Sequence, residues 1–127
     1  MTFNINWTFF LNVGSVPKSQ RIVDKINNLM EWPLVDIKIE RYWKDKTLYK
    51  VSAKSSFEAA TARDAFYNTM HSANVIARTW TINGPSHDAS WEFGGVASPG
   101  SCQISGVDSA SFSASTVGTF RSAATAV

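Results

Sequence analysis

The sequence has few of the residues that build chemical sites. Its 127 residues include one cysteine and two histidines. A single cysteine excludes a disulfide within the chain and is typical of a reducing compartment. No Cys-x-x-Cys or His-x-x-x-His pair is present, and no glycine-rich loop ends in Lys-Ser or Lys-Thr, so zinc-site and phosphate-loop spacings are both missing. We therefore expect no metal and no cofactor.

Long hydrophobic runs are missing as well. No stretch approaches the roughly 18 consecutive apolar residues of a membrane-spanning helix. The N-terminus lacks the basic segment and apolar run of a signal peptide. The net charge of +2 is too small to indicate nucleic acid or an anionic membrane as partner. These features predict a cytoplasmic protein with no membrane contact.

Aromatic residues, by contrast, are abundant. Five Trp and eight Phe stand in a chain that is 44% hydrophobic, and most of these rings should lie in a core because each buries a large apolar area. The length fits one domain. We expect a single α+β domain over residues 1–112. From residue 113 the composition turns to Ser, Thr, Ala and Gly, which predicts a flexible tail over 113–127.

Hydrophobic periodicity predicts the first elements. Residues 3–13 alternate apolar and polar side chains, as a strand with one buried face does. Pro17 suits the first turn of a helix, which the apolar spacing of residues 22–30 continues. Alternation returns in residues 35–40 and again in 49–54, which predicts two strands joined by a hairpin turn.

The next segment predicts a second helix and a fourth strand. Ser55 and Glu58 have the spacing of a capping box, and an alanine-rich helix is expected over residues 59–73. Residues 79–82 alternate again before a Gly-Pro break. The order strand, helix, strand, strand, helix, strand is that of a ferredoxin-like βαββαβ sandwich, with both helices on one face of an antiparallel sheet.

Beyond this minimal fold, short alternating pieces predict additional C-terminal β-strands. The pieces are separated by Gly, Pro and Ser, and they either extend the sheet or form a small second one. They comprise residues 91–93, 102–104 and 110–112.

Catalytic patterns are poorly represented. Ser86, His87 and Asp88 are consecutive, whereas the members of a catalytic triad come from positions far apart in the chain. Cys102 and His87 are a formal thiol–imidazole pair, but the alternation of Cys102 with Ile104 favours a buried cysteine that fills the core. We expect a protein that is not an enzyme.

The sheet face that the helices leave open is the better candidate site. Strand alternation directs Phe10, Lys38, Tyr42, Lys50 and Lys54 to this face. Six of the twelve basic residues of the chain lie between Lys38 and Lys54. These charges either form a binding surface or keep a solvated hairpin from pairing with other strands.

Three functions could use such a surface. Aromatic rings that stack on bases, with lysines along the phosphates, would bind RNA or single-stranded DNA. The strand 49–54 lacks the glycine and second aromatic residue of an RNA-recognition motif, which counts against this function. Binding another protein through aromatic anchors suits the low net charge and abundant Trp better. A small-molecule pocket at the interface of a barrel-like dimer is the third alternative.

Three segments stand out near the C-terminus: Trp80-Thr81-Ile82-Asn83-Gly84-Pro85, Trp91-Glu92-Phe93-Gly94-Gly95-Val96 and Ile104-Ser105-Gly106-Val107. They resemble the C-terminal half of small bacterial immunity proteins. This resemblance implies a cytoplasmic, single-domain inhibitor that neutralises a cognate toxin, with no catalytic residues. Many such inhibitors of nucleases are acidic, so the net charge of +2 argues against a nuclease as target.

Overall fold

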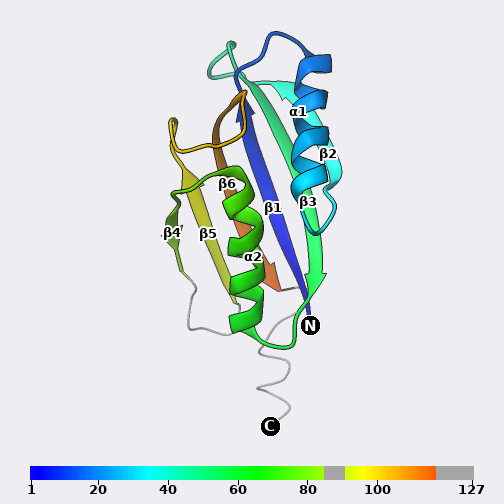
Figure 1. Cartoon of the computed structure of the whole chain (residues 1–127), viewed down its shortest axis with the longest axis vertical. Helices are drawn as coiled ribbons and strands as arrows, with labels where there is room; N and C mark the ends of the chain where they lie inside the picture. Colours follow the sequence, from blue (N-terminus) through cyan, green and yellow to red (C-terminus); the bar gives the residue numbers. More distant parts are fainter. Residues whose placement is uncertain (85–90, 117–127) are drawn as a thin grey trace.

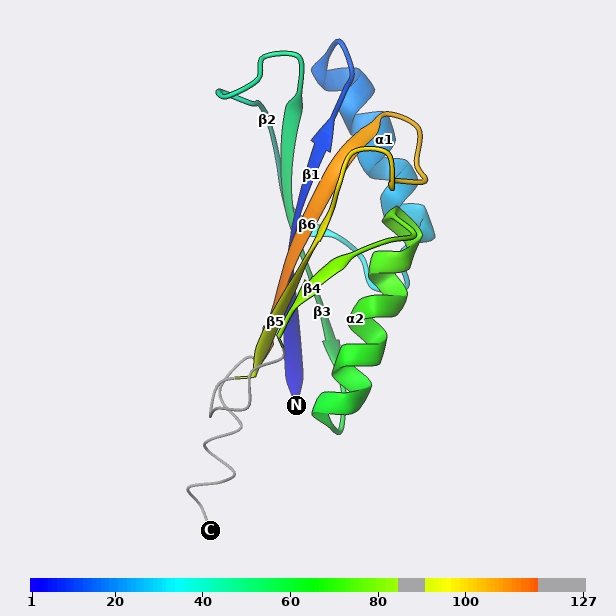
Figure 2. The ribbon, with the colours of Figure 1, turned by 90° about the vertical axis from the view of Figure 1, so that its left-hand side faces the viewer.

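The protein folds into two layers, a six-stranded antiparallel sheet and a pair of helices that cover one of its faces (Figures 1 and 2). The computed structural model describes residues 1–84 and 91–116. The elements are β1 (Thr2–Leu11), α1 (Val16–Leu29), β2 (Val35–Arg41), β3 (Tyr49–Glu58), α2 (Ala62–Ile76), β4 (Thr81–Asn83), β5 (Glu92–Ala97) and β6 (Val107–Thr116). The predicted α+β class is confirmed.

The strand order is β2-β3-β1-β6-β5-β4. The first three strands are arranged as a split βαβ unit, in which β3 lies between β2 and β1. A minimal ferredoxin-like sandwich would place β4 next to β1. In this structure β6 pairs with β1, and β4 lies at the far edge beside β5. The specific ferredoxin-like arrangement is therefore not confirmed, because a later strand occupies the central position.

Strand β1 is the centre of the sheet and shows why the two faces differ. It pairs with β3 on one side and with β6 on the other. Successive side chains of a strand point to opposite faces. The apolar set is almost fully buried beneath the helices, while the polar set between them is not. The buried side chains are Phe3, Ile5, Trp7, Phe9 and Leu11.

Both helices begin with a capping side chain. The Ser15 hydroxyl accepts a hydrogen bond from the Lys18 N–H, with Pro17 in the first turn as predicted. Thr61 does the same for the Asp64 N–H at the start of α2. The predicted capping box at Ser55 is wrong, because β3 continues to Glu58. Neither helix of the described residues is long and apolar enough to cross a membrane.

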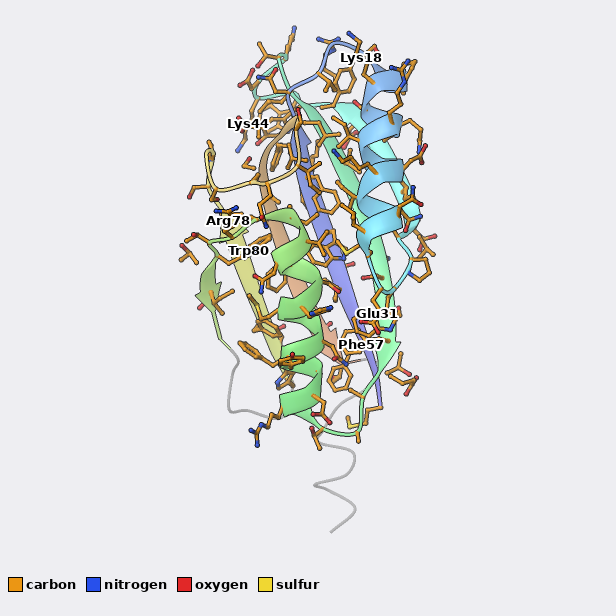
Figure 3. The ribbon with its side chains drawn as sticks, viewed as in Figure 1. Lys18, Glu31, Lys44, Phe57, Arg78 and Trp80 are labelled. Atoms are coloured by element: carbon orange, nitrogen blue, oxygen red, sulfur yellow. The ribbon has the colours of Figure 1, made fainter. Side chains whose placement is uncertain are left out.

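The core between α2 and the sheet is largely aromatic. Phe112 of β6 contacts Trp7, Trp80 and Phe93, with ring centroids 5.2–5.5 Å apart. Phe66 of α2 completes the group, 4.7 Å from Phe93. Trp80, labelled in Figure 3, donates its indole N–H to the carbonyls of Ala73 and Ala77 at 3.1 Å. These contacts fix the helix on the sheet.

The C-terminal strands extend the main sheet, one of the two arrangements that the sequence left open. The predicted strand at residues 102–104 is not formed, since only an isolated bridge joins Cys102 to Ala77. The tail predicted from residue 113 begins too early, because β6 runs to Thr116 between β1 and β5. Ala114 is fully buried there. Residues 117–127 of the predicted tail lie outside the described residues.

Candidate functional site

Small polar side chains cover the middle of the open sheet face. Asn4, Asn6 and Thr8 of β1 form its central row. The register places serines of β3 and β6 on both sides of this row. On the β3 side these are Ser52 and Ser56, and on the β6 side Ser109, Ser111, Ser113 and Ser115. The middle of the face is thus hydrophilic and built mostly from short side chains, with Lys54 opposite Asn6.

One end of the open face differs, because aromatic and basic side chains gather there. We call Phe10, Tyr42, Trp43, Lys44 and Lys50 the aromatic cluster. The rings of Phe10 and Tyr42 lie 4.8 Å apart, and those of Tyr42 and Trp43 lie 6.4 Å apart. The ammonium of Lys44 lies 5.1 Å from the Trp43 ring centroid, in cation–π geometry. Lys50 lies opposite Phe10 in the ladder.

Trp43 is the unusual member of this cluster. It is 76% exposed, whereas the other four tryptophans are buried or packed against the core. A tryptophan left in water forfeits the large apolar area that it could bury. An exposed tryptophan backed by two further rings is therefore a typical feature of a recognition surface.

The turn that carries Trp43 and Lys44 of the aromatic cluster is held by local hydrogen bonds. The Asp45 carboxylate accepts from the Thr47 N–H at 3.0 Å and from its hydroxyl at 2.6 Å. The hydroxyl and then the backbone N–H lower the pKa of Asp45, because both bonds favour the ionised form. The Tyr42 N–H donates to the Leu48 carbonyl at 2.9 Å and closes the hairpin.

Arg41 anchors the same hairpin from the helix-covered face. Its guanidinium donates to the Lys46 carbonyl at 2.7 Å and to the Tyr49 hydroxyl at 2.9 Å. It also lies over the Tyr49 ring, 5.0 Å from the centroid. Figure 2 shows the hairpin tip turned away from the helix layer, and Figure 3 labels Lys44 near this end of the sheet. The turn is thus held in a position that leaves Trp43 in solvent.

The structure brings together only some of the residues predicted for the site. Phe10, Tyr42 and Lys50 belong to the aromatic cluster. Lys38 is paired with Glu40 on its own strand, at 3.6 Å. Lys54 follows Lys50 by four residues, about 13 Å along the strand, and lies opposite Asn6. Lys38 and Lys54 are on the predicted face but outside the cluster.

Sequence reasoning missed Trp43 and Lys44. Counting alternation from the strand assigns Trp43 to the covered face, because the count assumes that the strand continues. The strand ends at Arg41, so strand alternation does not determine where the side chain of Trp43 points. A Trp-Lys pair directly before the turn residues was the available signal.

Of the residues considered for catalysis, the structure describes only Cys102. Cys102 is half-buried rather than fully buried as predicted, and burial followed by the nearby Asp108 raises the pKa of its thiol. His71 lies on α2, 4.0 Å from the Glu31 carboxylate at the protein surface. The segment 86–88 lies outside the described residues. In residues 1–84 and 91–116, no three His, Cys, Asp or Glu side chains are grouped to hold a metal.

The segments that resemble immunity proteins supply core and strand residues. Trp91 and Phe93 are buried. Gly95 lies beneath the Phe112 ring, where an added Cβ would be 2.6 Å from Phe112 Cε2. Gly84 has a φ of +95°, a conformation that glycine adopts at no steric cost. The residues that carry the resemblance therefore contribute to packing and turns.

A polar hollow lies at the opposite end of the open face. Its volume is about 450 Å³, and its lining includes Asn83, Glu92, Gly94 and Ser113. The strands β4, β5 and β6 supply these residues. This hollow is the feature closest to the small-molecule alternative.

Comparison of the chain with models of protein families, with curated proteins and with solved structures finds no match.

Proposed function

We propose that this is a non-enzymatic binding protein that engages a protein partner through the aromatic cluster. The observation that carries the proposal is Trp43, exposed to 76% and supported by the rings of Tyr42 and Phe10. Trp and Tyr contribute most of the energy in many protein interfaces, because their large rigid rings lose little conformational freedom on binding.

The charge around the cluster indicates the kind of partner. Between Lys38 and Lys54 the chain has six basic residues and two acidic ones, Glu40 and Asp45. A complementary partner would present an acidic surface with an apolar pocket for the Trp43 ring. The resemblance of the C-terminal segments to immunity proteins supports a narrower form of the proposal, an inhibitor of a cognate bacterial toxin.

A second candidate function is binding of RNA or single-stranded DNA. The same rings could stack on bases, and Lys44 and Lys50 could contact phosphates. Such binding would weaken steeply as salt is raised, because counterions are released from the nucleic acid. A protein interface centred on Trp43 would depend less on salt, since burial of the ring contributes much of its energy.

The test is capture of the partner from the lysate of the native host by the tagged full chain, with Trp43→Ala compared with the wild type. The substitution should weaken capture at least about tenfold, because a buried tryptophan anchor is worth about 2 kcal/mol or more. Tyr67→Ala is the matched control, since Tyr67 is another exposed aromatic residue and lies on α2.

The lysate is divided and one half is treated with nuclease. A stoichiometric protein that survives nuclease and is lost with Trp43→Ala supports the proposal, and relief of its toxicity by co-expression supports the inhibitor function. Nucleic acid in the eluate that is lost on adding salt supports the second candidate. Equal capture by Trp43→Ala and Tyr67→Ala variants would refute the aromatic cluster as the site.

A further inference from the structure

The strand β2 forms an edge of the sheet that pairs with β3 alone among the described residues. It carries Ile37, a 38% exposed isoleucine, and the ion pair of Lys38 with Glu40. Edge strands in natural proteins are often protected from pairing by charged side chains, especially lysines, which repel one another. Asp36, Lys38 and Glu40 of β2 alternate in sign, which makes the strand complementary to itself when two copies pair around Ile39.

The hydrogen-bonding directions of β2 follow from its pairing with β3. The Tyr42 N–H points toward β3, where it donates to the Leu48 carbonyl. Backbone groups alternate in direction along an antiparallel strand, so those of Glu40 and Lys38 also point toward β3. The backbone groups of Arg41 and Ile39 consequently point away from the sheet. They are available to another strand.

This geometry restricts how two copies of β2 can pair around a two-fold axis. Both residues of a hydrogen-bonded pair must direct their backbone groups outward, which a register centred on Ile39 satisfies. In that register Lys38 of each copy lies opposite Glu40 of the other. Centring on Lys38 would oppose two lysines, and also Asp36 with Glu40. Centring on Glu40 would oppose two glutamates.

We propose that this protein forms a symmetric dimer by antiparallel pairing of β2 with β2 of a second copy, centred on Ile39. The interface contains two Lys38–Glu40 pairs between copies, in addition to the backbone bonds between the two Ile39 residues. Lys38 and Glu40 occupy non-hydrogen-bonded positions, where opposed side chains come closest.

The sheet can grow in this way only once. Pairing of β2 with β2 uses this edge of both copies, and the bulge at the start of β2, with Asp36 at a φ of +52°, limits the regular ladder to residues 38–41. The opposite edge strand, β4, has three residues and offers no comparable ladder. The assembly is therefore a closed dimer. The axis is perpendicular to the sheet, so the two open faces lie on the same side and present two aromatic clusters to one partner.

The test measures the mass of the full chain in solution as a function of concentration, by light scattering after gel filtration. The wild type should have the mass of two chains and dissociate on dilution. Lys38→Glu and Glu40→Lys each turn two attractive pairs into repulsive ones and should weaken dimerisation about tenfold or more. Lys54→Glu is the control, since Lys54 is an exposed lysine of β3 away from the edge.

Restoring the charge complementarity makes the test specific. The double variant Lys38→Glu/Glu40→Lys should dimerise like the wild type. An equal mixture of the two single variants should form a heterodimer, because each charge then faces its opposite in the other chain. A wild type that stays monomeric throughout, or a mixture that stays monomeric, would overturn the proposal. A loss of dimerisation with Lys54→Glu as large as that with the single variants Lys38→Glu and Glu40→Lys would overturn it as well.

Discussion

The two faces of the sheet are built from alternate residues of the same strands, yet they have opposite properties. On β1, Phe9 is fully buried beneath the helices while Phe10, its neighbour, remains partly exposed beside Tyr42. On β3, Ser55 is buried and Ser56 is exposed. The comparison teaches that residue type alone does not decide whether a side chain of this sheet is buried. The face on which a residue lies decides its burial.

The largest difference in stability is expected between truncation of Phe9 and truncation of Phe10, two neighbours on β1. Phe9→Ala should lower the free energy of unfolding by about 3–5 kcal/mol, because it leaves a cavity in the packed core. Phe10→Ala should cost about 1 kcal/mol, since its ring contacts Tyr42 at the surface. Urea unfolding of both variants measures the difference. Equal losses would show that the open face is packed as tightly as the covered one.

A smaller effect is expected from Gly95→Ala in β5. The added methyl group would meet the ring of Phe112 and the side chain of Ile82 beneath the helices. Overpacking of this kind costs about 1–3 kcal/mol. Gly14→Ala is the control, because an added Cβ there has no atom within 4 Å. Thermal unfolding of both variants checks the expectation, and an unchanged midpoint for Gly95→Ala would mean that the aromatic core is loosely packed.

The smallest effect concerns the adjacent serines of β3. The Trp7 indole N–H donates to the Ser55 hydroxyl at 3.0 Å within the core. Ser55→Ala leaves this buried donor unpaired and should cost about 1–2 kcal/mol. Ser56→Ala removes a hydrogen bond to the Asn4 side-chain oxygen at the surface and should stay within about 0.5 kcal/mol of the wild type. Denaturant midpoints that shift by the same amount would contradict the contrast between the faces.

Local sequence patterns predicted most of the elements. The alternation of residues 3–13 gave β1 within two residues of its end, and Pro17 gave the first turn of α1. Alternation also predicted that Phe10, Tyr42 and Lys50 share the open face. These inferences succeed because the period of a strand or helix is a property of neighbouring residues, which the sequence displays directly.

Two of the failures concern residues whose role depends on distant partners. Ser55 matched a capping box locally, but pairing with β1 extends β3 past this residue. The Ser55 hydroxyl instead accepts a hydrogen bond from the Trp7 indole N–H. The serine-rich run from 113 resembled a tail, yet β1 and β5 hold its first four residues as a strand. Its serines face outward while Ala114 packs inward, an alternation that small residues display only weakly.

The sequence by itself thus determined the helices, most of the strands and the division of each strand into a buried and an open side. Only the tertiary structure decided that β6 lies beside β1, that the hairpin leaves Trp43 in solvent, and that β2 forms an edge. Pairing between strands depends on burial and hydrogen bonds between residues far apart in the chain. Such contacts leave no period in the sequence, so they appear only when the sheet is assembled.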